Sequence, residues 1–166
     1  MAKFVCIVNP AGRDGRSLKR WKSTEVVLKE ADIEIEIHFT KHIGHASEIA
    51  YSLRERDDIE CVVACGGDGT VHEVASGLRG SDKKVGIIPA GTGNDIARAH
   101  NIPLKNSKKI VDILINGVDR HVGAFRLQGT PAPSVDKYPE PTNNSKWDGE
   151  PDIDGRVVRW VFLESD

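Results

Sequence analysis

The amino-acid sequence predicts an α/β fold, a doubly wound parallel sheet with helices on both faces. Three observations indicate it. Short apolar runs alternate with segments of helical spacing, two of these runs are apolar at every position, and glycine-rich turns follow several of them. A continuous apolar run is typical of a strand buried on both faces of a parallel sheet. Strands that alternate with helices imply right-handed crossovers in such a sheet.

The first expected element is a buried strand over Phe4–Val8, and residues 9–12 (NPAG) after it are typical of a turn. A helix is expected over 17–31, whose apolar residues on one side are Leu18, Trp21 and Leu28. Between residues 33 and 39, isoleucine and phenylalanine alternate with glutamate and histidine. This period of two predicts a half-buried strand near an edge of the sheet.

The later elements continue the alternation. Apolar residues at i, i+3, i+4 and i+7 predict an amphipathic helix over 46–53, and the same spacing recurs over 71–78. The remaining expected elements are strands over 61–65 and 85–88, the second stopped by Pro89, and helices over 95–100 and 107–116, the second stopped by Gly117. The predicted order is therefore β-α-β-α-β-α-β-α-α.

Composition and charge exclude several classes of function. The 166 residues suit one domain, and a net charge of −2 with 5% aromatic residues argues against nucleic-acid binding. No apolar run approaches the length of a membrane span and no signal peptide precedes Lys3, so a cytoplasmic location is expected. No histidine pair at zinc spacing accompanies Cys6, Cys61 and Cys65, which we interpret as buried thiols.

Three loops combine glycine with polar groups: 9–15, 66–70 and 89–94. Each follows an expected strand, and ligands of parallel sheets bind beyond the carboxyl ends of the strands. The middle loop leads into a helix for which Thr70 and Glu73 form an expected capping box, with Thr70 as N-cap. Backbone amides at such a helix start suit phosphate, and the glycines would let phosphate approach the backbone.

Asp68 lies in this loop, where its carboxylate would repel phosphate. A divalent cation between the two would remove the conflict, and so would a role for Asp68 as proton acceptor from an attacking hydroxyl. Both roles belong to phosphoryl transfer. The structural alternative is that Gly66 and Gly67 only make a tight turn and that Asp68 supplements the helix cap. The chain has no G-x-x-x-x-G-K-[ST] motif, and no G-x-G-x-x-G follows the first strand, so neither a P-loop nor an ordinary dinucleotide fold is expected.

Four motifs follow one another along the chain: VNPAG (8–12), TKHIGHA (40–46), GGDGTVHE (66–73) and IPAGTGNDIAR (88–98). On these motifs the sequence resembles the diacylglycerol kinase catalytic domain family, which includes bacterial and archaeal lipid kinases and sphingosine kinases. The resemblance covers roughly residues 3 to 126. It implies a three-layer α/β domain like that of phosphofructokinases and NAD kinases.

The resemblance also implies an activity and a site. The activity is ATP-dependent phosphorylation of a lipid hydroxyl with Mg²⁺, and Asp68 is the expected catalytic residue, as base or as metal partner through Mg-ATP. The expected substrate-side residues are Asp95 and Arg98. The expected nucleotide-binding residues are Asn9, Pro10, Ala11, Gly12, Arg13, Thr40, Gly66, Gly67, Asp68, Gly69, Thr70, Val71, His72, Glu73, Thr92 and Asn94.

Some of these residues have simpler interpretations. Thr92 also suits a helix cap, His72 a solvated helix face, and Arg98 an ion pair with nearby acids. Basic residues also cluster between positions 13 and 22. Such a cluster is often only a solvated face, although Arg13 and Arg16 could meet phosphate. That cluster is Arg13, Arg16, Lys19, Arg20 and Lys22.

The composition changes from about residue 128 to 155, where five prolines interrupt any period and predict a long loop or linker. Residues 157–162 then indicate a strand that needs a partner sheet. The expected organisation is a nucleotide-binding kinase domain over 1–127, a linker over 128–156 and, over 157–166, a strand of an incomplete C-terminal β-rich domain. Members of the family generally continue into such a domain, so we expect a fragment of a longer protein.

The expected partners are ATP and a lipid substrate, without nucleic acid, and peripheral membrane contact and a homo-oligomer are compatible with this interpretation. Two alternatives stay open. One is a kinase of a soluble substrate, of the NAD kinase type. The other is a noncatalytic ATP-binding or regulatory module, because the chain contains so little of the second domain.

Overall fold

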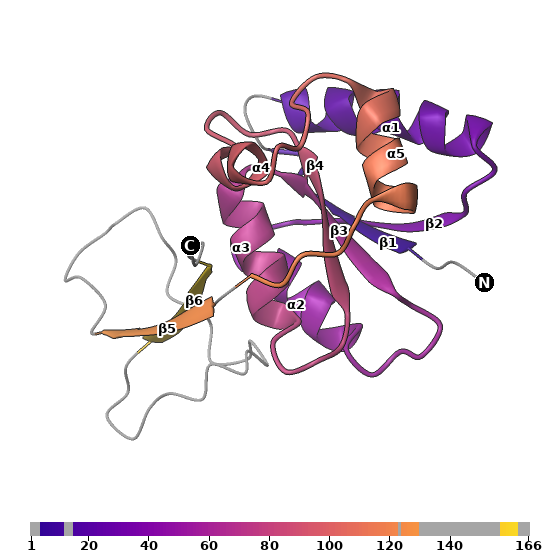
Figure 1. The fold of residues 1–166 in the computed structure, drawn as a ribbon. Helices are drawn as coiled ribbons and strands as arrows, with labels where there is room; N and C mark the ends of the chain where they lie inside the picture. The colour runs from indigo at the N-terminus through magenta and orange to yellow at the C-terminus, as the bar shows by residue number, and fades with distance from the viewer. Residues whose placement is uncertain (1–3, 12–14, 123, 130–156, 163–166) are drawn as a thin grey trace.

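The computed structural model describes residues 4–11 and 15–122 and the backbone of two strands, 124–129 and 157–162. Helices and strands alternate as the sequence predicts (Figure 1). They are β1 (Phe4–Val8), α1 (Arg16–Glu30), β2 (Ile35–Phe39), α2 (His45–Ser52), β3 (Cys61–Gly66), α3 (Asp68–Gly77), β4 (Lys84–Pro89), α4 (Asp95–Ala99), α5 (Ser107–Asn116), β5 (Ala124–Gly129) and β6 (Val157–Phe162).

Four strands form one parallel sheet in the order β2-β1-β3-β4. Cys6 at the centre of β1 is aligned with Ile37 of β2 and with Val63 of β3. Each connection along the chain between these strands contains a helix, which confirms the doubly wound parallel sheet. β2 lies at an edge and is mostly half-buried, as its alternating pattern predicts.

The sheet lies between two helical layers, with α1 and α5 on one face and α2 and α3 on the other (Figure 1). Successive side chains of a strand point to opposite faces, so a strand covered on both sides must be apolar at every position. Val5 and Ile7 of β1 accordingly pack toward α2 and α3, whereas Cys6 and Val8 pack toward α1 and α5. This division explains the continuous apolar runs.

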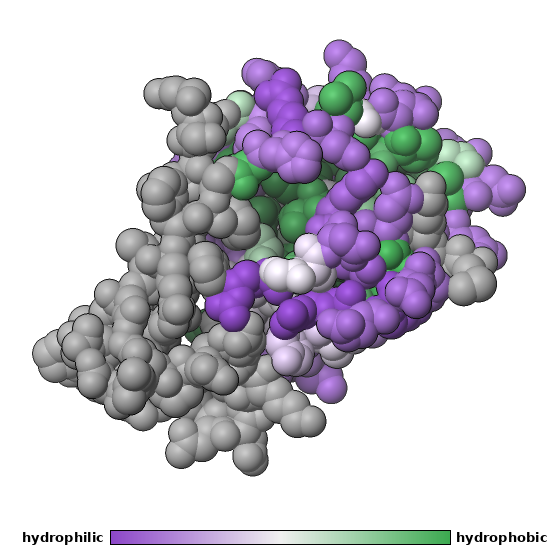
Figure 2. Space-filling model, turned by 60° about the horizontal axis from the view of Figure 1, so that its bottom comes forward, coloured by the Kyte–Doolittle hydropathy of each residue, from purple (hydrophilic) through white to green (hydrophobic). Residues whose placement is uncertain are grey.

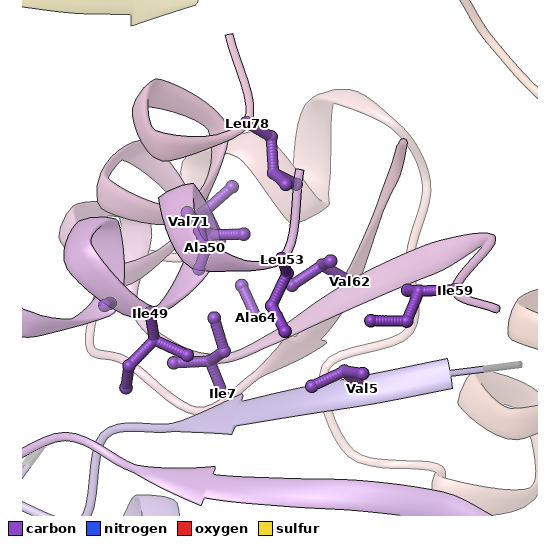
Figure 3. Close-up of a cluster of buried hydrophobic side chains, with 12 residues drawn as sticks. Val5, Ile7, Ile49, Ala50, Leu53, Ile59, Val62, Ala64, Val71 and Leu78 are labelled. Carbon is purple, nitrogen blue, oxygen red and sulfur yellow. The ribbon is translucent and has the colours of Figure 1, made fainter. Parts of the chain in front are cut away.

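Each face has its own hydrophobic cluster. Figure 3 shows the cluster under α2 and α3, in which side chains from both helices meet those of β1 and β3. Its buried members are Val5, Ile7, Ala46, Ile49, Ala50, Leu53, Ile59, Val62, Ala64, Val71, Val74 and Leu78. The other cluster consists of Cys6, Val8, Trp21, Leu28, Cys61, Val63, Cys65, Ile88, Ala90, Ile110 and Val111. Burial of each large aliphatic side chain stabilises the fold by about 1.5–3 kcal/mol.

The three cysteines are free thiols inside the second cluster. Burial, and the neighbouring Cys65, raise the pKa of Cys6 well above its ordinary value. Burial raises the pKa of Cys61 to about 12. The prediction of buried thiols is confirmed.

The structure differs from the sequence prediction in two elements. α3 begins at Asp68, three residues earlier than its apolar spacing indicates. β5 was not expected from the sequence; it pairs antiparallel with β6 and is the partner that this strand needed. The signal was present, because Phe125 and Leu127 alternate with Arg126 and Gln128. The expected linker lies outside the described residues apart from the two that end β5, and the division into domains stays a prediction.

The coloured part of the face drawn in Figure 2 is mostly hydrophilic. Figure 2 shows the molecule with the bottom of Figure 1 brought forward, where hydrophobic side chains gather in patches between hydrophilic ones. The large hydrophobic residues with more than half of their surface exposed, among those that the structure describes, are Val26, Ile43 and Val118. Among the described residues, no helix has the length and apolar character that crossing a membrane requires.

Candidate active site

Three loops meet at the carboxyl edge of the sheet, beyond the neighbouring strands β1, β3 and β4. Backbone hydrogen bonds join them in pairs. The N–H of Asn9 donates to the carbonyl of Cys65 over 3.0 Å, and the N–H of Ala90 donates to the carbonyl of Gly66 over 2.8 Å. The loops that the sequence analysis singled out therefore come together as expected in the part that the structure describes.

Asn9 is a side-chain link between the first two loops. Its Nδ2 donates to Oγ1 of Thr70 over 3.3 Å, and its Oδ1 accepts from the N–H of Ala11 over 3.1 Å. The next two expected residues of this loop, Gly12 and Arg13, lie outside the described residues. Asn9 thus fixes the end of β1 against the first turn of α3.

The glycines let two loops pack against each other. A Cβ at Gly67 would lie 3.1 Å from Cα of Gly91, and a Cβ at Gly91 would collide with Cα of Gly67. A Cβ at Gly66 would collide with the hydroxyl of Thr70. The missing Cβ atoms of Gly66 and Gly67 thus make room for protein, and the expectation that these glycines admit phosphate stays a prediction. Gly69 is different, because no described atom other than those of its chain neighbours and its own helix backbone lies within 4 Å of its Cβ position.

The expected capping box of Thr70 and Glu73 is wrong. α3 begins at Asp68, no side chain caps it, and Thr70 is already its third residue. The hydroxyl of Thr70 is buried and accepts from Asn9, while Oε2 of Glu73 accepts from the N–H of Ala46 over 3.2 Å. Both side chains bond to residues distant in sequence, and Glu73 thereby joins α3 to the first turn of α2.

The first turn of α3 keeps two backbone donors available. The N–H groups of Thr70 and Val71 donate to the carbonyl of Gly67 over 3.0 and 3.1 Å. The N–H groups of Asp68 and Gly69 donate to no other described residue. Unpaired N–H groups and the positive end of the dipole at a helix start attract anions. The start of α3 can therefore bind a phosphate.

The carboxylate of Asp68 has one oxygen held by the protein. Oδ1 accepts from the N–H of Ile96, at the start of α4, over 3.0 Å. Oδ2 lies 3.1 Å from the Cβ position of Gly93, and Oδ2 of Asp95 lies 3.2 Å from the same point. Asp68 is half-buried, whereas the side chain of Asp95 is 82% exposed. Two carboxylates thus approach one side of the third loop.

Asn94 closes the third loop on itself. It is buried and has a left-handed backbone with φ of 55°. Its Oδ1 accepts from the N–H of Gly91 over 2.8 Å, and its Nδ2 donates to the carbonyl of Gly91 over 2.9 Å. Thr92 is exposed and does not cap α4, so its expected alternative role is wrong. The side chain of Asn94 shapes the loop, because the loop backbone binds both its oxygen and its nitrogen.

The other residues expected to bind nucleotide or substrate differ in burial and in contacts. The side chain of Val71 is only 5% exposed and lies in the core. Arg98 donates to Asp95 over 3.1 Å, so it forms the ion pair that was its simpler interpretation. The N–H of Thr40 donates to the carbonyl of Val8 over 2.9 Å, which places the loop after β2 beside the end of β1. Pro10 and His72 are half-buried and Ala11 is exposed.

The basic cluster on α1 is partly structural. Arg20 donates to the backbone carbonyls of Leu104 and Lys105 over 2.8 and 2.9 Å, so it joins α1 to the segment before α5. Ser17 was not among the expected residues; it is buried on the same helix and donates to the carbonyl of Ala90 over 3.3 Å. A lone serine at a helix start carries no signal of such a distant partner.

A groove of about 460 Å³ lies at the other end of the sheet. The end of α1 and the first part of β2 line it, with Leu28, Ile33 and Ile35 among its apolar residues. These residues precede the carboxyl ends of the strands, so the groove has no part in the site.

Comparison with known proteins shows which protein family this chain matches. A model described as the diacylglycerol kinase catalytic domain matches residues 3–127. The chain is 36% identical over 133 residues to a diacylglycerol kinase of Bacillus subtilis, a match that covers 78% of this chain and 43% of the relative. It is 31% identical over 128 residues to a diacylglycerol kinase of Mycobacterium tuberculosis, covering 77% and 41%. The chain thus spans less than half the length of these curated relatives.

A solved structure has the same fold. The crystal structure of a diacylglycerol kinase from Bacillus anthracis matches with a TM-score of 0.60 and 25% identity, over 77% of this chain and 43% of that one. This likeness agrees with the fold class that the sequence predicts.

Proposed function

Because the chain belongs to the diacylglycerol kinase catalytic domain family, we propose that it is the nucleotide-binding part of an ATP-dependent lipid kinase. The enzyme transfers the γ-phosphate of ATP to a lipid hydroxyl, and the names of the relatives point to diacylglycerol as the acceptor. One observation carries the proposal. The first turn of α3, with its available N–H groups and Asp68, lies where three loops converge.

In this proposal the phosphates of ATP lie at the start of α3. The N–H groups of Asp68 and Gly69 donate to phosphate oxygens, and the helix dipole favours the negative charge. A hydrogen bond to a charged group contributes roughly 1.5–3 kcal/mol. Asn9 supports the arrangement, since its bond to Thr70 holds the turn in place before the ligand arrives.

The donor set fits Mg²⁺, which prefers one or two carboxylates together with phosphate oxygens. Asp68 and Asp95 would hold the ion, because their Oδ2 atoms approach the same side of Gly93. Bound Mg²⁺ neutralises charge on the phosphates. The bond from Ile96 fixes the carboxylate of Asp68 and leaves Oδ2 for this task. The second carboxylate beside it favours the metal role of Asp68 over the role of proton acceptor.

Glu73 positions the site rather than binding nucleotide. Its carboxylate would repel phosphate, and it instead accepts from the N–H of Ala46. This bond holds the start of α2, and with it the TKHIGHA motif at 40–46, against α3. Thr40 lies on this motif and contacts the nucleotide in the proposal.

The acceptor side of the reaction belongs to the longer protein. The matched relatives are more than twice as long as the aligned segment, and we place the lipid-binding part and a peripheral contact with the membrane in their additional length. Asp95 and Arg98 face this side in the proposal, and they pair with each other in the described chain.

Two measurements test the function. Calorimetric titration of the 166-residue chain with Mg-ATP should give binding that weakens when Mg²⁺ is removed, and an absence of heat at millimolar nucleotide would refute the nucleotide site. The full-length protein should phosphorylate diacylglycerol in detergent micelles. Phosphorylation of NAD in its place would favour the soluble-substrate alternative, and nucleotide binding without any transfer would favour a noncatalytic module.

A further inference from the structure

Three side chains with metal-binding atoms lie together at the start of α2: His42, His45 and Glu48. One such atom of each residue lies within 4.8 Å of the other two. The two imidazole rings are stacked with centroids 4.7 Å apart, and Nε2 of His42 lies 3.9 Å from Oε2 of Glu48. His42 and His45 lie in the TKHIGHA motif, but neither the resemblance nor the proposed kinase mechanism gives the side chains of this cluster a role.

The backbone accounts for the cluster. Gly44 has a left-handed conformation with φ of 86°, which turns the chain so that His42 reaches the first turn of α2. His45 and Glu48 are three residues apart on that helix and therefore lie on one side of it. A turn and a helical spacing thus place three ligands around one point.

His42 already has the tautomer that binds metal. Its Nδ1 lies 3.0 Å from the carbonyl oxygen of Ile43. A carbonyl only accepts, so Nδ1 carries the proton and the neutral ring has its lone pair on Nε2, the atom that faces Glu48. A backbone carbonyl that holds the second ring nitrogen is the usual support of a metal-binding histidine.

His45 is a neutral ligand whose coordination has one cost. Burial and the neighbouring His42 lower the pKa of His45, which keeps its ring uncharged at neutral pH. Its Nδ1 accepts from the N–H of Lys41 over 3.0 Å. Coordination through Nδ1 replaces this hydrogen bond, and coordination through Nε2 moves the ring proton to Nδ1 and ends it too. Metal binding therefore exchanges the bond from Lys41 for a metal bond.

We propose that His42, His45 and Glu48 form a site for a divalent transition-metal ion, Zn²⁺ in the first place. Two imidazoles and one carboxylate suit Zn²⁺ with a water as fourth ligand, whereas Mg²⁺ prefers oxygen atoms alone. Ligands of a tetrahedral Zn²⁺ are roughly 3.3 Å apart, so the ligand atoms, which lie within 4.8 Å of one another and 3.9 Å apart for His42 and Glu48, must move closer together. The side chains of His42 and Glu48 are 53% and 33% exposed and have room to do so. The site stands independently of the kinase activity.

The test uses the untagged chain, with Zn²⁺ in a calorimeter and Co²⁺ as a spectroscopic probe whose visible absorption reports nitrogen and oxygen ligands. We expect a single ion to bind without competition from millimolar Mg²⁺. His42→Ala and Glu48→Gln should each weaken binding about tenfold or more, by analogy with losses at other metal sites. His100→Ala, which removes a histidine after α4, should leave the affinity unchanged.

Circular dichroism shows whether each variant is folded. An absence of Zn²⁺ and Co²⁺ binding by the folded protein would overturn the proposal. So would affinity that persists in the His42→Ala, Glu48→Gln double variant, or affinity that is lost with His38→Ala instead, since His38 pairs with Glu36 and is not one of the three proposed ligands.

Discussion

Replacement of Asp68 by asparagine separates the charge of this side chain from its shape. Asparagine Oδ1 can still accept from the N–H of Ile96, so the link to α4 persists as a neutral hydrogen bond. A carboxylate near a helix start contributes about 0.3–1 kcal/mol, and charged hydrogen bonds exceed neutral ones by a similar amount. The free energy of unfolding should therefore fall by about 1 kcal/mol, which lowers the melting temperature by roughly 4 °C.

The effect of the same change on phosphoryl transfer should be far larger. Loss of a carboxylate that holds the metal or accepts the proton lowers the rate about 10²–10⁴-fold, which corresponds to roughly 3–5 kcal/mol. The assay is lipid phosphorylation by the full-length protein, with kcat and KM measured beside thermal melts. Nucleotide affinity without Mg²⁺ should stay constant or rise, because one repulsive charge has gone.

Asn106→Ala is the matched control for Asp68→Asn. Asn106 Oδ1 accepts from the N–H of Lys109 and caps α5, and loss of such a cap also costs about 1 kcal/mol. This variant should melt like Asp68→Asn and retain full turnover. Asp68→Asn with turnover within tenfold of the parent protein would refute the assigned role and make Asp68 a structural residue.

Three further predictions concern the loop glycines, Glu73 and His45. Gly91→Ala should lower the free energy of unfolding by about 1–3 kcal/mol in urea titrations, because its Cβ collides with the neighbouring loop. Gly69→Ala should instead weaken Mg-ATP binding without destabilising the fold, since its Cβ meets no described atom beyond its chain neighbours and its own helix backbone; equal behaviour of the two variants would contradict this division. Glu73→Ala should raise the Kd for Mg-ATP, and Glu73→Gln should recover much of the loss because glutamine still accepts from Ala46; unchanged affinity in both would exclude the positioning role. The pKa of folded His45 lies below its ordinary value of 6.5. As the pH falls, His45 therefore takes up a proton in the unfolded chain before it does so in the folded chain. The contribution of His45 to the free energy of unfolding is fully present above pH 6.5 and is lost as the pH falls through the folded pKa. His45→Gln should flatten this part of the pH profile of urea unfolding, and an unaltered profile would assign the dependence to other groups.

The fold was predictable because its signals are local. A strand covered on both faces must be apolar at each position, as β1 and β3 are, and an edge strand alternates, as β2 does. β5 was harder to find, since its six residues precede a proline-rich segment and its partner β6 is distant in sequence. A short alternating pattern predicts a strand well only when the pairing strand is near.

The site was predictable in its location and less so in its contacts. The order of strands brings the three loops to one edge, and topology alone gives that result. The pattern T-x-x-E fits a capping box locally, yet Thr70 pairs with Asn9 and Glu73 with Ala46. These partners are separated by 61 and 27 positions along the chain, and nothing in the local sequence indicates that they outcompete the cap.

Chemical modification of the buried cysteines can report how often the helices α1 and α5 separate from the sheet in the native protein. Cys6 lies on β1, and Cys61 and Cys65 lie on β3, all on the side that α1 and α5 cover. A thiol reagent needs both access and a thiolate, and burial prevents both because it also raises the pKa of Cys6 and Cys61. Modification must therefore wait until these helices leave the strands. The rate at which such a reagent modifies the folded chain measures how often this side of the sheet opens, with no label added.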